Sequence, residues 1–167
     1  VSVSDGDIPI NANGTGMVTM TANSVTGDVI PGKFAGTNFT NSLLVGHSTT
    51  GTLSAATYNT GVGLAAMDAI TSGDNNVGVG ASALSALTGG NRNVAIGKSS
   101  MNQVAGDDNT GVGYYALSET TGSDNTAIGK DALYNATGDH NIGIGKDAGD
   151  NISSGSGNVI IGSVDAA

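Results

Sequence analysis

The sequence predicts a mainly β chain, folded as a parallel β-roll or β-solenoid of 16- and 17-residue repeats. Three observations lead to this prediction. A five-residue motif recurs at a nearly constant step, its branched side chains alternate with small ones, and a glycine always closes it. Self-similarity at a short, fixed step is typical of stacked repeats, in which each unit packs on its neighbours.

The motif is an asparagine, a β-branched residue, a small residue, a second branched residue and a glycine. We number the positions of each unit from its asparagine, which is position 1. A weaker copy of the motif begins at Ser42. The clear copies begin at Asn59, Asn76, Asn93, Asn109, Asn125, Asn141 and Asn158.

Positions 2 to 4 predict a short strand. Because side chains alternate along a strand, the branched residues at positions 2 and 4 share one face. Position 3 faces the other way and is glycine or alanine in six of the seven clear units, with Ile160 as the exception. The glycine at position 5 indicates a corner where the backbone turns through positive φ.

Positions 8, 9 and 12 predict one or two helical turns after this corner. These positions are mostly small or apolar, as in Ala83, Leu84 and Leu87, and would share one face of a helix. The small residue at position 3 would let the strand approach that face. A polar turn with a closing glycine completes each unit, and these glycines are Gly73, Gly89, Gly106, Gly122, Gly138 and Gly155.

Stacking the units places successive strands about 4.8 Å apart, so that equivalent residues of the units line up in columns along the stack. The asparagines Asn59, Asn76, Asn93, Asn109, Asn125, Asn141 and Asn158 would then form a ladder. In this ladder each side-chain amide bonds its neighbours and the corner backbone.

The chain divides into two regions. Residues 1–33 lie outside the clear repeat and are expected to form short strands and loops, with strand-like alternation over residues 17–21. Residues 34–167 form the repeat region, whose rungs start near 42, 59, 76, 93, 109, 125, 141 and 158. The chain begins at Val1 and ends while the pattern is still running, so we expect a fragment or a processed product.

The branched residues at positions 2 and 4 predict an apolar stripe on the outer face of the sheet. A large contiguous apolar patch is rare on a monomer, so identical stripes are expected to pack together around a rotation axis. A narrow stripe suits a three-sided core better than a flat sandwich, although the sequence alone does not fix the number of chains. The predicted trimer core comprises Val62, Val77, Val79, Val94, Ile96, Val112, Ile128, Ile142, Ile144, Val159 and Ile161.

The composition excludes several classes of protein. Apolar residues make up 38% of the chain and aromatic residues only 4%, which argues against a thick conventional core. A net charge of −9 with five basic residues disfavours binding to nucleic acid or to an anionic membrane. The absence of cysteine excludes disulfides and thiolate metal sites, and no apolar run approaches the roughly 20 residues of a membrane helix.

Two motifs resemble nucleotide-binding loops, and neither supports an enzyme. Residues 78–83 fit the dinucleotide fingerprint G-x-G-x-x-A, but the match is part of the repeat, and a 16-residue unit cannot supply a βαβ unit of about 30 residues. Residues 97–99 resemble the end of a P-loop, but Arg92 stands where the first glycine is required. No local signature links serine, aspartate and histidine as a triad. No catalytic or cofactor-binding residue is predicted.

The aspartates of the polar turns have two interpretations. Stacked, they could hold Ca²⁺ together with backbone carbonyls. Ordinary Asx-turn chemistry explains them without a metal, and the calcium-binding GGxGxD repeat is absent, so no metal or other cofactor is predicted. These residues are Asp74, Asp107, Asp108, Asp124 and Asp139.

Three lysines recur at the same position of the repeat, whereas the histidines and two of the tyrosines do not follow its pattern. Lysines 98, 130 and 146 share position 6 and are expected to form a solvated column on a corner. His47 and His140 lie near opposite ends of the predicted rod, too far apart to share a metal. Tyr114 and Tyr115 follow a glycine corner and either fill space beside the neighbouring turn or contact a glycan or protein partner.

The pattern N-[TVI]-[GA]-[VI]-G followed by A-L-x-x-x-T-G resembles the head repeats of trimeric autotransporter adhesins. It resembles more strongly the repeat regions of bacteriophage tail fibres, especially those of marine and cyanobacterial phages. The resemblance covers residues 30–162 and implies a trimeric parallel β-roll in an elongated virion-borne or extracellular fibre. Because the adhesin repeat is usually shorter and lacks the helical turn, the adhesin likeness is the looser one.

We therefore expect a non-enzymatic structural segment of a phage tail fibre that extends and presents receptor-binding parts and contacts the host surface. The alternative is a bacterial trimeric surface adhesin or an extracellular filament subunit. The expected partners are two further copies of the chain, neighbouring fibre or virion proteins, and a host-surface glycan or protein, without nucleic acid or membrane insertion. Ice binding would need a regular threonine array, but Thr60, Thr110 and Thr126 are interrupted by valine and isoleucine.

Overall fold

The structure is a computed structural model that describes residues 32–36, 39–45, 55–103 and 106–163. The predicted strand over residues 17–21 and His47 lie outside the described residues. Within the described residues, no helix is long and apolar enough to cross a membrane.

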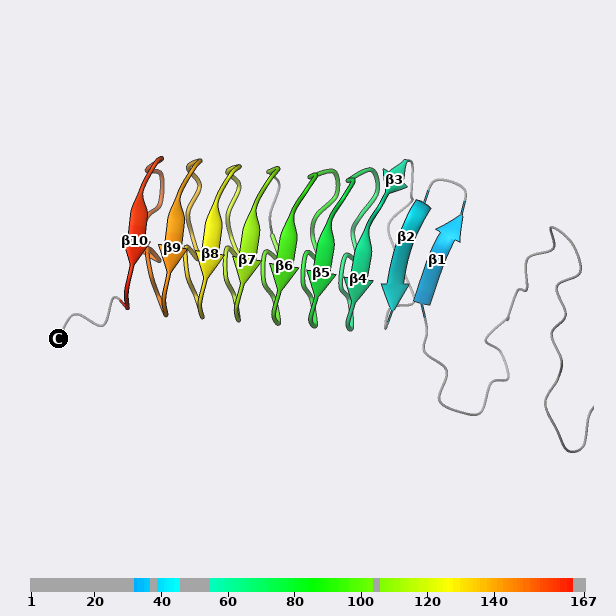
Figure 1. Ribbon diagram of the computed structural model, residues 1–167, viewed down its shortest axis with the longest axis horizontal. Helices are drawn as coiled ribbons and strands as arrows, with labels where there is room; N and C mark the ends of the chain where they lie inside the picture. Colours follow the sequence, from blue (N-terminus) through cyan, green and yellow to red (C-terminus); the bar gives the residue numbers. More distant parts are fainter. Residues whose placement is uncertain (1–31, 37–38, 46–54, 104–105, 164–167) are drawn as a thin grey trace, which may run out of the picture.

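Ten strands of the described chain form a single sheet that runs along a rod (Figure 1). β1 pairs antiparallel with β2, and every other pairing is parallel. From β4 to β10 the chain passes through seven strands and completes six turns between the first and the last, which confirms the predicted β-solenoid. The strands are β1 (Gly32–Gly36), β2 (Phe39–Val45), β3 (Ala56–Thr57), β4 (Thr60–Val62), β5 (Val77–Val79), β6 (Val94–Ile96), β7 (Thr110–Val112), β8 (Thr126–Ile128), β9 (Ile142–Ile144) and β10 (Val159–Ile161).

The register of the parallel strands matches equivalent positions of the repeat. Val77 pairs with Val94 and Val79 with Ile96, so positions 2 and 4 each form a column along the rod. The change from a 17-residue to a 16-residue step does not disturb this register. The extra residue of the longer units lies in the polar turn, where a loop can absorb it.

The segment after each glycine corner is not the predicted helical turn, and the described residues contain no helix. Positions 7 and 9 have positive φ, as at Ser82 (58°) and Leu84 (53°). The N–H groups of these two positions point in opposite directions along the rod. Ser82 N donates to Leu64 O (2.8 Å) in the preceding rung, and Leu84 N donates to Ser100 O (3.1 Å) in the next. Bonds between rungs thus replace the i→i−4 bonds of a helix, and only isolated i→i−3 bonds remain along the chain, such as Ala83 N to Gly80 O (3.3 Å) and Leu87 N to Leu84 O (3.1 Å).

The predicted inner face is nevertheless correct, because positions 8, 9 and 12 still point into the coil. Position 3 of the strand lies opposite them, and both Ala95 and Ala127 are fully buried. A Cβ added at Gly143 would lie 2.7 Å from Leu133 Cγ, so a larger residue there would displace the core. The inward apolar residues include Ala66, Met67, Ile70, Ala83, Leu84, Leu87, Met101, Ala116, Leu117, Ala132, Leu133 and Ala136.

Two columns of glycine let successive rungs approach closely. At the corner, Gly80 has φ +132°, and an added Cβ would lie 2.5 Å from Gly97 O of the next rung. In the polar turn, a Cβ on Gly90 would lie 2.6 Å from Gly106 O. The predicted member of this second column, Gly89, is not part of it: its nearest neighbour would be Ser72 Oγ at 3.3 Å. Gly89 is instead in the extra length of the longer unit.

Candidate functional site

The branched residues of positions 2 and 4 form the outer face of the sheet in the single chain. We call this surface the aliphatic stripe; it comprises the eleven predicted trimer-core residues together with Thr60, Thr110 and Thr126. Val79 is 37% exposed and Ile128 is 44% exposed, whereas their neighbours at position 3 are buried. From β4 to β10 every stripe side chain is exposed or half-buried.

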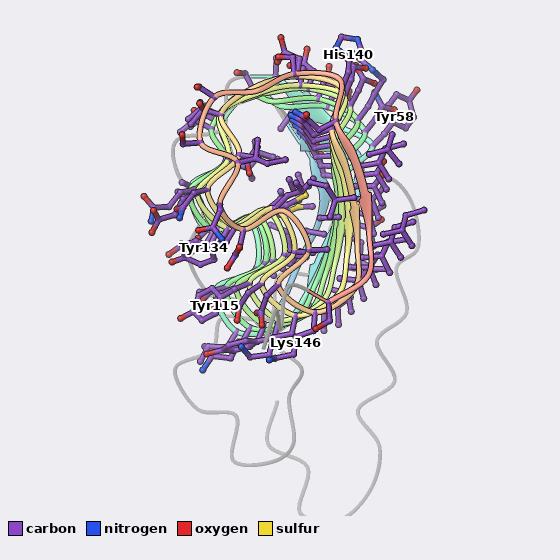
Figure 2. The ribbon with its side chains drawn as sticks, turned by 90° about the vertical axis from the view of Figure 1, so that its left-hand side faces the viewer. Tyr58, Tyr115, Tyr134, His140 and Lys146 are labelled. Carbon is purple, nitrogen blue, oxygen red and sulfur yellow. The ribbon has the colours of Figure 1, made fainter. Side chains whose placement is uncertain are left out.

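Charged columns flank the aliphatic stripe at both ends of the strands. One edge carries Lys98, Lys130 and Lys146 at position 6, all exposed. The opposite edge carries Arg92, Asp108, Asp124 and His140, also exposed. Figure 2 shows His140 and Lys146 at opposite ends of the strands, with the stripe between them. An apolar centre with a polar rim is the usual anatomy of a protein interface.

The asparagines of position 1 form a continuous ladder inside the rod. Six of them, from Asn59 to Asn141, are fully buried. Asn109 illustrates the pattern: its Nδ2 donates to Gly122 O (2.9 Å), and its Oδ1 accepts the backbone N–H of Asn125 (3.0 Å). Asn158 closes the described ladder, half-buried, through its backbone N–H and Nδ2 to Asn141 Oδ1. Ser42 begins it by accepting the backbone N–H of Asn59 (2.7 Å).

A second polar ladder runs two residues before the asparagines, in the opposite sense. Here the side chain of the following rung accepts a backbone N–H of the preceding one, as when Asn91 Oδ1 accepts from Asp74 N (2.9 Å). Asp107 Oδ1 accepts from Asn91 N (2.9 Å), and Asp139 Oδ1 accepts from Ser123 N (2.8 Å). Aspartate, asparagine and serine serve equally because each offers a short side-chain acceptor.

This second ladder divides the five turn aspartates between two columns. Asp74, Asp107 and Asp139 accept backbone amides of the preceding rung, 16 or 17 residues back, so bonds between rungs explain them and not the Asx turns that the sequence suggested. Asp108 and Asp124 lie one position later, where φ is +59°. Within the described residues, no three histidine, aspartate or glutamate side chains gather as a metal ion would require.

The backbone conformation explains which residues occupy the column directly before the asparagines. Residues at positive φ are most often asparagine, aspartate, histidine or glycine, and Asn75, Asp124 and His140 fit this preference. Arg92, also at positive φ, makes a bidentate pair with Asp108 in which both N–O distances are 2.6 Å. The hydrogen bond lowers the pKa of Asp108 and raises that of Arg92. His140 Nε2 lies 3.7 Å from Asp124 Oδ2.

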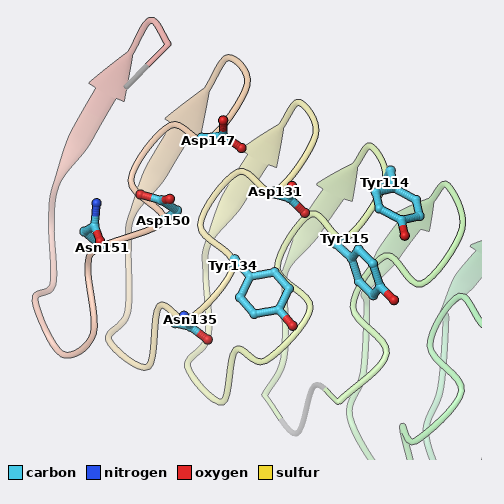
Figure 3. Close-up of a pocket in the computed structure, with 8 residues that line it drawn as sticks. All are labelled: Tyr114, Tyr115, Asp131, Tyr134, Asn135, Asp147, Asp150 and Asn151. Atoms are coloured by element: carbon cyan, nitrogen blue, oxygen red, sulfur yellow. The ribbon is translucent and has the colours of Figure 1, made fainter. Parts of the chain in front are cut away.

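A groove of about 470 Å³ opens on the side of the rod away from the aliphatic stripe (Figure 3). It spans the turns that follow β7, β8 and β9. We call it the tyrosine groove; Tyr114 adjoins its end, and its other lining residues are Tyr115, Asp131 and Asp147 from position 7, Tyr134 and Asp150 from position 10, and Asn135 and Asn151 from position 11.

The tyrosines of the groove are held by contacts with one another and with neighbouring columns. The Tyr115 and Tyr134 rings lie edge to face with centroids 5.9 Å apart, and Tyr114 packs on Tyr115 at 4.3 Å. Lys98 Nζ and Lys130 Nζ lie 5.8 Å and 6.0 Å from the centroid of Tyr114. The Tyr134 hydroxyl donates to Glu119 Oε1 (3.0 Å), which raises the pKa of Tyr134.

The carboxylates of the groove differ in their partners. Asp131 pairs with Lys130, which raises the lysine pKa, and Asp147 Oδ2 lies 2.9 Å from Lys146 Nζ. Asp150 Oδ1 is shielded from solvent and has no hydrogen-bond partner, the one such side-chain atom among the described residues. An unpartnered buried oxygen costs free energy and requires an explanation.

The sequence singled out only Tyr114 and Tyr115 of this groove. Asp131, Tyr134, Asp147 and Asp150 were missed, because only positions 8, 9 and 12 of this segment were given a place by the predicted helical turn. The available signal was a break in composition at position 7, where tyrosine or aspartate stands only in the last three complete units. Comparisons of the chain with protein-family models, with curated proteins and with solved structures find no match.

Proposed function

We propose that the chain is a structural segment of a homotrimeric fibre, of the kind found in bacteriophage tail fibres, which extends and presents receptor-binding parts. One observation carries the proposal: the aliphatic stripe lies open along every rung from β4 to β10, on the outer face of a chain that has already buried its own core. Such a surface favours association with further copies of the same surface.

The size of the stripe is sufficient for stable assembly. Full burial of a valine or isoleucine contributes about 1.5–3 kcal/mol, and most stripe side chains are more than half-buried within their own chain. Assembly would therefore add about 1 kcal/mol for each side chain. Over the eleven predicted core residues the gain is on the order of 10 kcal/mol per chain, before the entropy of association is subtracted.

The two charged edges favour a parallel arrangement of the chains around the axis. In a parallel ring the lysine edge of one chain meets the edge of its neighbour that carries Asp108 and Asp124 beside Arg92 and His140. The lysines, two of which already pair within their own chain, gain further carboxylate acceptors there. In an antiparallel pair each edge would meet its own copy, and lysine would face lysine. Opposite charges at the rim of an interface favour the first arrangement and fix its register.

The hydrogen bonding along the rod supports a mechanical role. Each rung is bonded to the next through the sheet and the two polar ladders, and the turn backbone adds further bonds between rungs. Shearing or bending the rod would break several of these bonds at once. We infer that the chain acts as a strut rather than as a catalyst, outside the cell or on a virion.

A bacterial surface adhesin or filament subunit is the second candidate. The expected helical turn set the repeat apart from the adhesin repeat, and the described residues contain no helix. Only the repeat length still distinguishes the two resemblances. Flanking sequence separates them: a virion-attachment domain supports the phage fibre, and an outer-membrane anchor supports the adhesin.

Sedimentation velocity and native mass measurement test the assembly. We expect the wild-type protein to have three times the 16.2 kDa mass of the chain and to resist dilution. Val79→Asp and Ile128→Asp should abolish assembly, because each would place a charge opposite its symmetry copies. Both positions are partly exposed in the single chain, so the solenoid itself should keep its circular dichroism spectrum.

Ala86→Asp is the matched control. It adds the same charge at an exposed position in the connecting turn, away from the strands, and should leave the trimer intact. A monomeric wild-type protein at micromolar concentration would contradict the proposal. So would an Ile128→Asp protein that still sediments as a trimer, since the stripe would then lie outside the interface.

A further inference from the structure

We propose that the tyrosine groove binds a neutral saccharide along the side of the rod. The inference rests on four features of the groove: its aromatic rings, its balance of charge, its unpartnered oxygen and its position on the rod. It goes beyond the structural role above, and only its fourth feature, the position of the groove, refers to the proposed trimer, because all the lining residues belong to one chain.

The rings supply flat apolar surface beside polar groups. Tyr115 and Tyr134 come from consecutive turns and are half-buried, so each keeps part of its ring open toward the groove (Figure 3). Tyr134 is oriented by its hydrogen bond to Glu119, and the raised pKa keeps the phenol neutral. The C–H face of a sugar ring fits such a surface, and the sugar hydroxyls then meet the surrounding polar side chains.

The charge of the groove favours a neutral ligand. Two of its three aspartates, Asp131 and Asp147, are already paired with lysines. These carboxylates can still accept hydrogen bonds, but their charge is largely compensated locally. An anionic ligand would be repelled by Asp150. A cationic ligand could pair with Asp150 alone, because lysines already occupy Asp131 and Asp147. A polyhydroxylated neutral molecule avoids both costs.

The unpartnered oxygen of Asp150 needs a hydrogen-bond donor. The Asp150 carboxylate lines the groove, and because the χ2 torsion is soft, a partial rotation would bring this oxygen within reach of a donor on a ligand. Asn135 and Asn151, both exposed at the margin, can donate and accept toward the same ligand. Charge-assisted bonds from sugar hydroxyls to Asp150 would be among the strongest contacts available.

The groove lies where assembly through the stripe would leave it free. Figure 2 shows Tyr115 and Tyr134 on the side of the coil away from the strands, whose outward side chains form the stripe. A parallel trimer would carry three copies of the groove on its outer surface. Several weak sites on one rod would bind a polysaccharide with a higher effective affinity than one site alone.

Affinity electrophoresis and tyrosine fluorescence test the proposal with four neutral probes: dextran, amylose, galactomannan and chitohexaose. The chain has four tyrosines and no tryptophan, so its fluorescence comes from tyrosine, and three of the four adjoin the groove. We expect at least one probe to retard the wild-type protein and to change this fluorescence. Poly-lysine is included to detect a cationic partner.

Four variants locate the binding. Tyr134→Ala should weaken it about 3- to 10-fold, and Asp150→Asn about 10-fold, while Tyr134→Phe should bind nearly as well as wild type because the ring is kept. Tyr58→Ala is the control, because Tyr58 is 58% exposed and lies at the strand edge, in the same column as His140 but five rungs before it (Figure 2). Unchanged circular dichroism and melting temperature establish that each variant is folded.

Three results would overturn the proposal. The wild-type protein could bind none of the four neutral probes, or Tyr58→Ala could weaken binding as much as Tyr134→Ala. Binding of poly-lysine in their place, lost in Asp150→Asn, would assign the groove to a cationic partner. Release of shorter sugars from a bound polysaccharide would show that the groove is catalytic and not only a binding site.

Discussion

Replacing Asn109 with alanine tests whether the asparagine ladder holds the rungs together. The substitution leaves two buried backbone groups without partners, the carbonyl of Gly122 and the N–H of Asn125, and it also removes the acceptor of Asn125 Nδ2 (3.2 Å). Each such group costs about 1–3 kcal/mol, so the loss should be about 2–6 kcal/mol. That is a large part of the roughly 5–15 kcal/mol by which a typical domain is stable.

Asn158→Ala is the matched control. Asn158 is half-buried at the last described rung, and its Nδ2 donates to Asn141 Oδ1 (2.8 Å). That oxygen keeps a partner in the variant, because it also accepts the backbone N–H of residue 158 (3.0 Å). The expected loss is therefore no more than about 1 kcal/mol.

Urea denaturation followed by circular dichroism compares the free energies of unfolding, and amide hydrogen exchange locates the change. In Asn109→Ala the N–H of Asn125 should exchange at least about 30-fold faster, because its acceptor is gone. Equal stability losses in the two variants would refute the reasoning, since the ladder would then contribute no more in the interior than at its end.

Three further predictions follow from the same structure. Asn109→Asp should be least harmful at acid pH and increasingly destabilising as pH rises from about 4, because burial raises the pKa of the new carboxyl above its unfolded value; urea midpoints against pH measure this, and a flat difference from wild type would contradict it. Gly90→Ala should lower the melting temperature while Gly89→Ala changes it little, because only the first Cβ meets the next rung; equal shifts would show that rung spacing does not limit this position. The Arg92–Asp108 pair should stabilise the fold above the ordinary aspartate pKa and lose that contribution as pH falls through the lowered pKa of Asp108. Carboxyl NMR should find this pKa below its usual range in wild type and near it in Arg92→Gln, and an unchanged value would contradict the pairing.

The predictions made from residues that recur at the same position of each repeat agree with much of the observed fold. The repeat placed the strands, their parallel register, the inward position 3 and the outward stripe, because a stacked architecture repeats one environment at every rung. Asparagine at position 1 followed from the same logic. An amide that both donates and accepts can bond to its copies in the rungs above and below, and few other side chains can do so.

The conformation of the connecting turns could not be predicted from the sequence. Ala83, Leu84 and Leu87 fit one face of a helix, and the same spacing fits a flat turn with alternating φ that points the same residues inward. The difference lies in where the backbone N–H groups find acceptors, and those acceptors are in neighbouring rungs. A local pattern contains no information about them until the rungs are stacked.

The sequence by itself determined a periodic rod with an aliphatic stripe on one face, because periodic side chains impose periodic burial. Only the tertiary structure decided that Tyr115, Tyr134 and Asp150 share a groove, and that Gly90 rather than Gly89 lies between rungs. These residues are 16 to 35 positions apart or differ by a single place in a turn. Which of them become neighbours depends on the path of the backbone through each turn. Hydrogen bonds between successive rungs fix that path.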